Sequence, residues 1–281
     1  MNSAVPGQAS LWPEGCCSAV VFTFDFDAEE VWLADDPENA RRLGVLSQGT
    51  YGAKVGLRLV LDILARHIVK ATFFVPGRVA ERHPDKVNDI VAAGHEIGHH
   101  GYTHIPPTSQ TAEQEERDLV RGKEVLGRFA PVTGYRSPSW NLTDRSLALL
   151  QAHGFSYSSN MLDDIRPYRH DGSGIIELPV HWILDDAAHF WFSDDTWEKK
   201  ISTVPEVEEL WRAEFTGIRE LGGCCVFTMH PQFIGRPGRL KLLDSMLTMA
   251  RQTPGVWIAS AGEVAAHAAA ALSHERDAHG T

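Results

Sequence analysis

Five short stretches of the chain bring together polar, titratable residues of the kinds that form hydrolytic sites. They read Thr23-Phe24-Asp25-Phe26-Asp27, His100-Gly101-Tyr102-Thr103-His104, Arg136-Ser137-Pro138-Ser139-Trp140, Ser158-Ser159-Asn160 and Thr228-Met229-His230-Pro231. Imidazole nitrogens with a carboxylate can bind one divalent metal ion and leave a coordination position for water, which is the ligand set of a catalytic zinc site. The residue types therefore indicate hydrolysis that depends on a single metal ion.

The first stretch ends in two carboxylates that can share one site. Val20-Val21-Phe22 begins a β-branched and aromatic run that is typical of a β-strand. Residues two apart on a strand lie on the same face, so Asp25 and Asp27 can point together. Neighbouring carboxylates repel unless a cation lies between them or one is protonated. The alternative is a solvated strand end without a function.

The histidine pair can bind a metal only in one kind of backbone. His100 and His104 are four residues apart, a spacing that on a helix forms the two-histidine face of a zinc protease. Gly101 between them and Pro106-Pro107 after them disfavour a helix. On a straight strand, residues four apart lie roughly 13 Å from each other, too far to share an ion. We therefore expect the strand to end and the chain to turn near Gly101.

In order and spacing, these stretches resemble the polysaccharide deacetylase family, also called carbohydrate esterase family 4 or the NodB-homology domain. That family has an aspartate pair after its first strand, an H-x-x-x-H motif, an R-x-P motif and a late histidine. The match extends from about residue 20 to residue 262. The resemblance implies that Asp27, His100 and His104 are the metal ligands.

The resemblance also implies the catalytic roles. Asp25 would be the general base, Arg136 the partner that orients it, and His230 the general acid. The chemistry suits the hydrolysis of an amide, because a bound metal ion lowers the pKa of water towards about 7 and polarises the carbonyl. Asp25 would take the proton of the water, and His230 would protonate the departing nitrogen. The alternative for Arg136 is a surface ion pair, which would constrain little.

Three departures from the family pattern bear on the substrate. Phe26 separates Asp25 from Asp27, whereas most secreted members have adjacent aspartates. The late motif reads His-Pro-Gln from His230, where many secreted members have His-Asp. The aromatic residue after the R-x-P motif is displaced to Trp140. These variants resemble an intracellular branch that includes peptidoglycan-deacetylase homologues, allantoinase-like enzymes and cyclic imide hydrolases.

Length and hydrophobic pattern predict one α/β catalytic domain that spans residues 1–281, with a core at about 20–262 and peripheral tails at 1–15 and 265–281. Strand-like segments alternate with helix-like ones, which indicates an irregular or incompletely closed barrel of seven to eight parallel strands. The polar stretches would then meet at the carboxyl ends of the strands. The predicted strands are 20–27, 71–75, 96–99, 134–136, 156–159, 175–180, 225–229 and 256–260; the clearest predicted helices are 54–67, 112–129, 144–153, 204–221 and 240–251.

Two connecting regions are predicted to shape a pocket. Residues 29–52 form a long connection after the first strand, of the kind that often makes a lid or a pocket wall. Residues 181–197 are dense in aromatic side chains, and we expect these to close a dry pocket or bury a subunit interface rather than to stack on sugars. Two aspartate pairs, Asp163-Asp164 and Asp185-Asp186, are candidate specificity groups, with at least one pair expected in a solvated loop. We predict four substrate-binding residues: Trp32, Trp140, Asn160 and Trp182.

Net charge limits the possible binding partners, and the N-terminal residues and the cysteines bear on the cellular location. The formal net charge of −11 argues against nucleic acid or an anionic membrane as a partner. The first fifteen residues contain no basic segment followed by an apolar one, so we expect no standard export signal and a cytoplasmic protein. The cysteines occur as Cys16-Cys17 and Cys224-Cys225 and are expected to be reduced, without the C-x-x-C spacing of a metal site.

The sequence therefore predicts a metal-dependent hydrolase of non-peptide carbon–nitrogen bonds. The favoured reaction is N-deacetylation of an N-acetylated sugar or a peptidoglycan-type substrate, and the alternative is opening of a small cyclic imide or ureide. A binding protein without turnover is a further alternative, but Asp25 and His230 argue against it. One divalent ion is expected, zinc first, although Fe, Co, Mn or Ni also suit the ligands. The aromatic segment offers material for a homo-oligomer interface.

Overall fold

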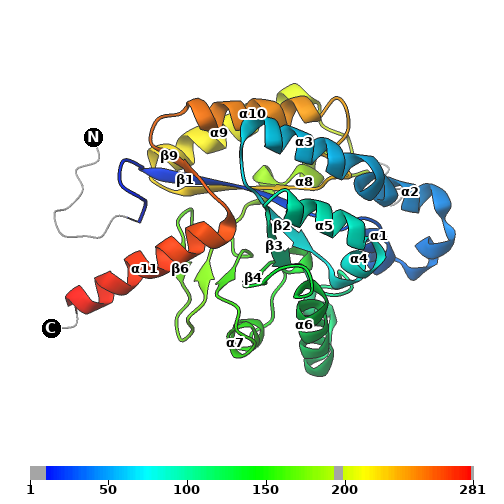
Figure 1. Ribbon diagram of the computed structural model, residues 1–281, viewed down its shortest axis with the longest axis horizontal. Helices are drawn as coiled ribbons and strands as arrows, with labels where there is room; N and C mark the ends of the chain where they lie inside the picture. The colour runs from blue at the N-terminus through cyan, green and yellow to red at the C-terminus, as the bar shows by residue number, and fades with distance from the viewer. Residues whose placement is uncertain (1–10, 193–198, 280–281) are drawn as a thin grey trace.

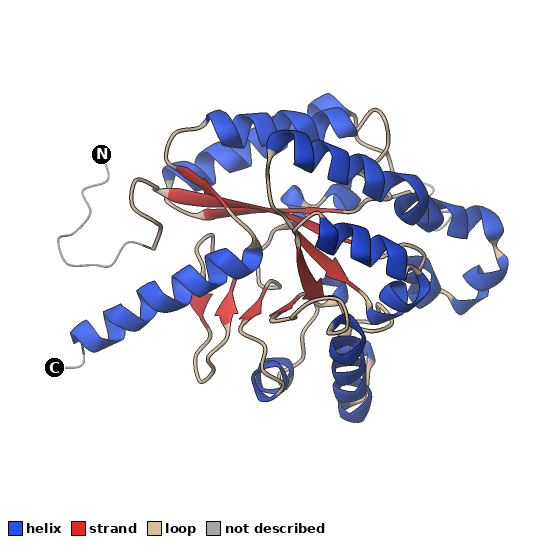
Figure 2. Ribbon diagram, viewed as in Figure 1, coloured by secondary structure: helices blue, strands red, loops and turns tan. Residues whose placement is uncertain are grey.

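The computed structural model describes residues 11–192 and 199–279. Its centre is a curled sheet with helices packed on both sides (Figures 1 and 2). The strands follow the order β6-β7-β5-β4-β3-β2-β1-β8, with β9 attached to β1 outside this path. Neighbouring strands are parallel except for β6 and β7. This confirms the predicted α/β class.

The predicted strands are all present, and most are shorter than expected. Each of the eight predicted segments overlaps an observed strand. The additional strand is β6, a two-residue antiparallel strand that is too short to give a sequence pattern. The strands are β1 (Ser18–Asp25), β2 (Thr72–Val75), β3 (Glu96–His99), β4 (Gly134–Tyr135), β5 (Tyr157–Ser158), β6 (Tyr168–Arg169), β7 (Ile176–Glu177), β8 (Cys224–Met229) and β9 (Val256–Ile258).

The sheet curls without closing into a complete barrel. Strand β1 pairs with β8 along one edge, and on its other edge β9 pairs with the first half of β1 and β2 with the second half. The sheet ends at β8, and no further strand pairs with the outer edge of β8 in the described residues. An isolated parallel bridge between Asp185 and Thr228 is the pairing found there. The prediction of an irregular, incompletely closed barrel is thus confirmed.

Most of the helices pack their apolar stripes against the sheet or against one another. In α9, the buried residues Val207, Trp211, Phe215 and Ile218 recur at helical spacing, and a capping box between Thr203 and Glu206 fixes its start. The helices are α1 (Glu30–Asp35), α2 (Leu43–Tyr51), α3 (Leu57–His67), α4 (Gly77–Arg82), α5 (Pro84–Ala92), α6 (Ala112–Leu126), α7 (Ser146–Ala152), α8 (Asp186–Phe190), α9 (Val204–Glu220), α10 (Leu240–Gln252) and α11 (Ala261–His279).

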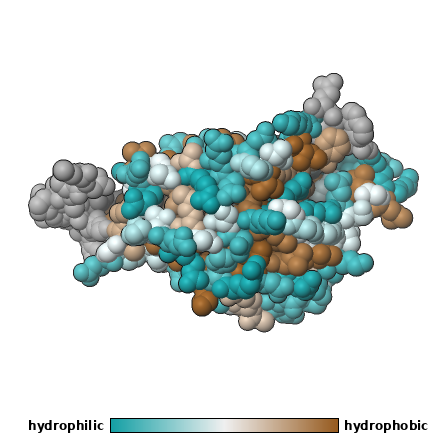
Figure 3. All heavy atoms as spheres, turned by 90° about the horizontal axis from the view of Figure 1, so that it is seen from above, coloured by the Kyte–Doolittle hydropathy of each residue, from teal (hydrophilic) through white to brown (hydrophobic). Residues whose placement is uncertain are grey.

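Helices α3, α9 and α10 lie side by side over one side of the sheet (Figure 1). Seen from above, this part of the surface has hydrophilic residues interspersed with hydrophobic patches (Figure 3). Within the described residues, none of the helices has both the length and the apolar character that crossing a bilayer requires.

Two predicted regions differ from the structure. Residues 29–52, expected as a loop, are largely helical, with α1, a 3₁₀ segment at Pro37–Arg41 and α2. Helices were predicted from apolar residues that recur every three or four positions, and residues 29–52 contain too few of them to show this pattern. Residues 265–281, expected as a tail, largely continue α11, and Ala265 and Ala268 are buried against the sheet. Small alanine side chains allow this close packing but give little periodic signal.

Successive side chains of β1 point to opposite faces of the sheet, so every second one reaches the interior of the curled sheet. Val20, Phe22 and Phe24 belong to the hydrophobic core shared with α3, α9 and α10. Ala19 and Val21 point to the opposite face. Since side chains alternate along a strand, Asp25 shares the face of Val21 and lies on the inner side. The first strand therefore presents a carboxylate to the interior at its last residue.

A close contact joins α3 to the loop that follows β8. Between α2 and α3 the chain forms a π-helical turn, Gly52–Gly56. A Cβ atom on Gly56 would lie 2.0 Å from the carbonyl oxygen of Pro231, and one on Gly235 would lie 2.6 Å from the Cα of Gly56. The loop after β8 can take its observed position only because these two residues lack side chains.

We predict that Gly56→Ala lowers the free energy of unfolding by about 1 to 3 kcal/mol, because the added methyl group forces the two backbones apart. Gly44→Ala is the control, since a Cβ there would meet nothing within 4 Å and alanine favours a helix. Denaturant unfolding of both variants measures the difference. Equal stability of Gly56→Ala and the unmodified protein would show that the contact is not tight.

Candidate active site

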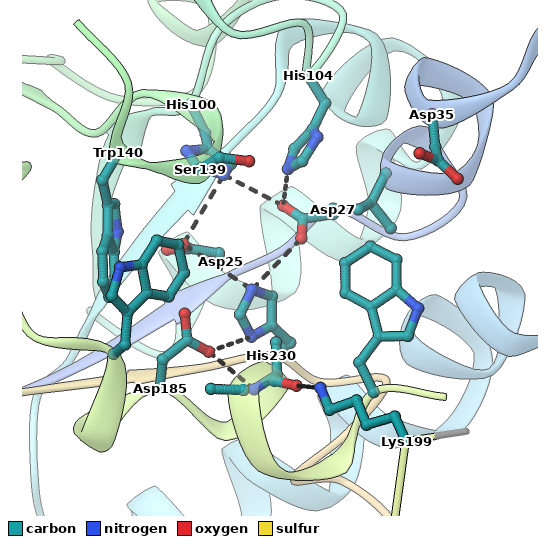
Figure 4. Close-up of a pocket in the computed structure, with 15 residues that line it drawn as sticks. Asp25, Asp27, Asp35, His100, His104, Ser139, Trp140, Asp185, Lys199 and His230 are labelled. Atoms are coloured by element: carbon teal, nitrogen blue, oxygen red, sulfur yellow. Dashed lines mark hydrogen bonds and ion pairs between the residues drawn. The ribbon is translucent and has the colours of Figure 1, made fainter. Parts of the chain in front are cut away.

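The polar stretches identified in the sequence meet at one end of the sheet. Parallel strands that lie side by side bring their carboxyl ends to the same edge, which is where barrel enzymes form their sites. A cavity of about 520 Å³ opens there, and Figure 4 shows the side chains that line it. The strand ends contribute Asp25 from β1, His100 after β3, Arg136 after β4, Ser159 after β5 and His230 after β8.

Asp27, His100 and His104 form a compact group at this cavity. Oδ1 of Asp27 lies 3.5 Å from Nε2 of His100 and 3.7 Å from Nε2 of His104. All three residues are buried, and this oxygen has no hydrogen-bond partner within residues 11–192 and 199–279. An unpartnered buried carboxylate oxygen is costly unless a cation or a proton compensates it.

The geometry of this group fits one divalent cation. Two ligands about 2.1 Å from a tetrahedral ion lie about 3.4 Å apart, close to the separations found here. Nδ1 of His100 donates to the carbonyl oxygen of Arg136 at 2.8 Å, which leaves the Nε2 lone pair facing Asp27. Burial lowers the pKa of His104 to about 4, so its imidazole is neutral and able to ligate.

A turn brings the two histidines together, as the sequence predicted. Strand β3 ends at His99, and both Gly101 and His104 adopt positive φ angles, of 72° and 56°. The imidazole rings of His100 and His104 consequently lie 5.0 Å apart, centroid to centroid. The carboxylate of Asp118, on α6, accepts hydrogen bonds from backbone amides of this turn. Sequence reasoning did not identify Asp118, because no motif links it to the histidines.

Arg136 is completely buried and pairs with Asp25. Its Nη1 lies 2.8 Å from Oδ1 of Asp25 and 2.7 Å from the hydroxyl of Thr23, and its Nη2 donates to Oγ of Ser159 at 2.9 Å. The guanidinium also covers the ring of Phe74 at 4.2 Å. A surface ion pair, the alternative for Arg136, is therefore wrong.

The ion pair with Arg136 affects the protonation state of Asp25. Burial alone would raise the pKa of Asp25, but its cationic neighbours, led by Arg136, outweigh burial and lower it. The carboxylate is consequently ionised at neutral pH. Its second oxygen, Oδ2, lies 3.7 Å from Nε2 of His100 and 4.0 Å from Nε2 of His230. Asp25 thus presents a free, charged oxygen to the space between these imidazoles.

His230 is held by a carboxylate that the sequence did not connect to it. Nδ1 of His230 lies 2.6 Å from Oδ1 of Asp186, and its backbone amide donates to the other oxygen. Burial alone would lower the pKa of His230, but neighbouring carboxylates, led by Asp186, raise it to about 10. Nε2 faces the cavity, 3.6 Å from Oδ2 of Asp27.

The two predicted aspartate pairs have different positions. Asp185 and Asp186 are buried beside His230, whereas Asp163 and Asp164 are exposed. This confirms that at least one pair lies in a solvated loop. Asp185, Asp186 and His230 are also close enough to hold a metal ion. The direct contact between His230 and Asp186 already occupies one ligand atom of each, so this group fits a cation less well than Asp27 and its histidines.

Two of the four predicted substrate-binding residues line the cavity. Trp140 and Trp182 contact each other with their ring centroids 4.2 Å apart and their planes tilted by 35°, and Trp182 is 46% exposed. Trp32 is 1% exposed, does not line the cavity and packs behind Trp191 at 5.7 Å. Its predicted role in substrate binding is wrong because α1, unexpected in the sequence, turns it into the core. Residues 193–198 of the predicted aromatic segment lie outside the described part of the chain.

Asn160 is also placed away from the cavity. It is fully buried, its Oδ1 accepts from the backbone amide of Ser137 at 2.7 Å, and its Nδ2 donates to Oγ of Ser158 at 2.8 Å. Its own backbone amide donates to the buried carboxylate of Glu177. The predicted substrate contact of Asn160 is therefore wrong. The residue instead fixes the corner that follows Arg136.

Other lining residues were not singled out from the sequence. They include Asp35 at the end of α1, Ser139 in the R-x-P corner, Trp191 after α8, and Lys199. Trp191 belongs to the aromatic segment that was expected to shape a pocket. Asp35 lies in residues 29–52, which were predicted to form a lid or a pocket wall, and Lys199 was not singled out because charged residues in connections are usually solvated.

The chain is similar to known proteins over nearly its whole length. A family model described as polysaccharide deacetylase matches residues 51–158, a range that includes both histidines of the compact group. The peptidoglycan deacetylase of Helicobacter pylori is 28% identical, over 85% of this chain and 92% of its own. A Mycobacterium smegmatis crystal structure named as a polysaccharide deacetylase is 40% identical with a TM-score of 0.89, over 95% of both chains. An allantoinase structure has a TM-score of 0.79 at 20% identity over 94% of both chains, a likeness of fold alone.

We predict that Asn160→Ala lowers the free energy of unfolding by about 1 to 3 kcal/mol, because it leaves the buried amide of Ser137 without a partner. Asn141→Ala, at an exposed position nearby, is the control and should change stability little. Thermal and denaturant unfolding measure both effects. Unchanged stability combined with a raised KM would restore Asn160 as a substrate-binding residue.

Proposed function

The chain belongs to the polysaccharide deacetylase family, and we propose that it is a metal-dependent hydrolase that removes the acetyl group from an N-acetylated amino sugar. The observation that carries this proposal is the unpartnered oxygen of Asp27 facing two imidazoles, with Asp25 and His230 beside it. Similarity over 92% of the Helicobacter pylori peptidoglycan deacetylase supports an amino sugar as the substrate.

Asp27, His100 and His104 would hold the cation, for which zinc is the first expectation and Fe, Co, Mn or Ni also suit. When bound, such a cation polarises an amide carbonyl and makes a water molecule more acidic. Asp25 would accept a proton from the attacking water through its free Oδ2. Arg136 would keep Asp25 ionised and fix its orientation, which a buried guanidinium does through directed hydrogen bonds.

His230 would protonate the nitrogen that leaves. Its Nδ1 is tied to Asp186, so Nε2 is the nitrogen that can transfer a proton into the cavity. A pKa of about 10 keeps this imidazole protonated at neutral pH. An amide nitrogen departs poorly as an anion, so a positioned acid is the contribution that the reaction requires.

The cavity favours a small substrate or the end of a chain. Its volume of about 520 Å³ is typical of small-molecule sites. Trp140 and Trp182 lie in contact and form one wall, on which the apolar face of a sugar ring can pack. Asp25, Asp27 and His230 are all less than a tenth exposed, so the acetamido group would have to enter the cavity to react.

The small volume of this cavity and its buried polar groups also favour a second candidate function, the opening of a small cyclic imide or ureide. A flat ring amide would fit between tryptophan walls, and His230 could protonate its ring nitrogen as it protonates an acetamide. A binding protein without turnover is less favoured, because Asp25, Arg136 and His230 are positioned for catalysis. The cytoplasmic location and the homo-oligomer stay predictions from the sequence.

We predict that Zn²⁺ raises the melting temperature of the metal-stripped protein by roughly 5 °C at a hundred times its dissociation constant, because it binds only the folded chain. Asp27→Ala should abolish this shift, and Asp163→Ala, at an exposed position, should retain it. Differential scanning fluorimetry measures all three proteins. An equal shift in Asp27→Ala would place the ion elsewhere.

We predict that the zinc-loaded protein releases acetate from N-acetylglucosamine oligomers. Asp25→Asn and His230→Ala should each lower kcat by about 100-fold to 10,000-fold, because they remove the base and the acid. Asp163→Asn is the matched control at an exposed position and should keep its activity.

A parallel panel of cyclic imides and ureides tests the second candidate function. Ring opening without acetate release would favour that candidate over deacetylation. Unchanged turnover in both Asp25→Asn and His230→Ala would contradict the assigned roles whichever substrate reacts.

A further inference from the structure

One basic side chain reaches the cavity from the side opposite Trp140. Lys199 lines the same space as Asp25, Asp27 and His230, and its side chain extends into the part of the site below His230 (Figure 4). Among the lining residues that the structure describes, it is the only lysine or arginine. The proposed mechanism gives this residue no role.

The ammonium group of Lys199 is poorly satisfied within the described parts of the chain. Its Nζ donates to the carbonyl oxygen of Ala187 at 3.4 Å, at the long end of the range for a hydrogen bond. No carboxylate of residues 11–192 or 199–279 lies within 4 Å of it. Since an ammonium offers three donors, at least one can accept a partner from the cavity.

The neighbouring lysine shows an ordinary surface arrangement. Lys200 is largely exposed and pairs with Glu206 at 3.3 Å, at the start of α9. Lys199 is instead half-buried and turned into the cavity. The two adjacent residues therefore provide a test position and a matched control with the same side chain.

The carboxylates near Lys199 leave room for an anionic ligand. Asp25 is neutralised by Arg136, and the buried pair Asp185 and Asp186 lies against His230. Asp35 is exposed and lies farther along the wall, near His104 (Figure 4). An anion at Lys199 would therefore meet Asp25, Asp185 and Asp186 beside cationic partners, and the proposed cation would balance Asp27.

We propose that Lys199 binds an anionic group of the substrate, so that the site prefers N-acetylated sugars that carry a carboxylate or a phosphate to neutral ones. The inference rests on the proposed deacetylation and names its substrate class. An ammonium and an anion form a charge-assisted hydrogen bond that is stronger than a neutral one, particularly in a partly buried site. The tryptophan wall would hold the ring while Lys199 holds the anionic substituent.

A different role for Lys199 predicts a different result. If the ammonium only balances the buried acids around His230, its removal would disturb catalysis equally for every substrate. If it binds the substrate, its removal would affect anionic substrates and leave neutral ones nearly unchanged. A comparison of substrates that differ in one charged group therefore separates the two roles.

The test compares kcat/KM of the zinc-loaded protein for three sugars with the same acetamido group: N-acetylglucosamine, N-acetylmuramic acid with its carboxylate, and N-acetylglucosamine 6-phosphate. We expect at least one anionic sugar to be preferred by about tenfold to a hundredfold, the usual effect of a charged hydrogen bond. Lys199→Met should remove this preference and change the neutral sugar by less than about threefold. Lys199→Arg should partly retain the preference, and Lys200→Met should keep it. The better anionic sugar identifies carboxylate or phosphate as the recognised group.

An equal loss for all three sugars in Lys199→Met, or no anionic preference in the unmodified protein, would overturn the inference. If neither these three sugars nor the N-acetylglucosamine oligomers release acetate, the proposed function fails, and calorimetry with the zinc-loaded Asp25→Asn variant still tests Lys199. Tighter binding of the anionic sugars that disappears on adding Lys199→Met would support its role. Equal binding of all three sugars, or no binding, would reject it.

Discussion

The fully buried guanidinium group of Arg136 connects the ends of neighbouring strands through hydrogen bonds. Arg136, after β4, pairs with Asp25 at the end of β1, donates to Ser159 after β5, and accepts a hydrogen bond on its backbone oxygen from His100 after β3. A buried charge that loses its partner destabilises a protein by about 3 to 5 kcal/mol. The fold therefore tolerates this arginine only with the strand ends in their observed positions, and the same positions bring the proposed base and a candidate metal ligand together.

The remaining buried charges follow the same rule of local compensation. Asp186 lies against His230, which keeps that imidazole protonated and turns its Nε2 to the cavity. One buried oxygen of Asp27 has no compensating group among the described residues, and it faces two imidazoles. The proposed divalent cation would supply the missing charge there and would also supply the chemistry of hydrolysis. The stability of the buried Asp27 and the proposed hydrolysis would thus both require a cation beside Asp27.

The sequence predicted what depends on local pattern and failed where the outcome depends on packing. The strands followed from their β-branched runs, and the turn after β3 from Gly101 and its proline neighbours. The contact between Asp186 and His230 could not be predicted, because it joins residues 44 positions apart through the register of the sheet. Trp32 and Asn160 were misassigned since their residue types serve equally well in a pocket and in a core. Lys199 was not singled out because a lysine in a connection, here next to Lys200, is usually solvated.

The central claim is that Asp27, His100 and His104 hold one divalent cation. Diffraction data from zinc-loaded crystals, collected on both sides of the zinc absorption edge, locate the ion without reference to activity. The account predicts a single anomalous peak about 2 Å from Oδ1 of Asp27 and from Nε2 of both histidines. A peak between Asp185, Asp186 and His230, or no peak near Asp27, would contradict it.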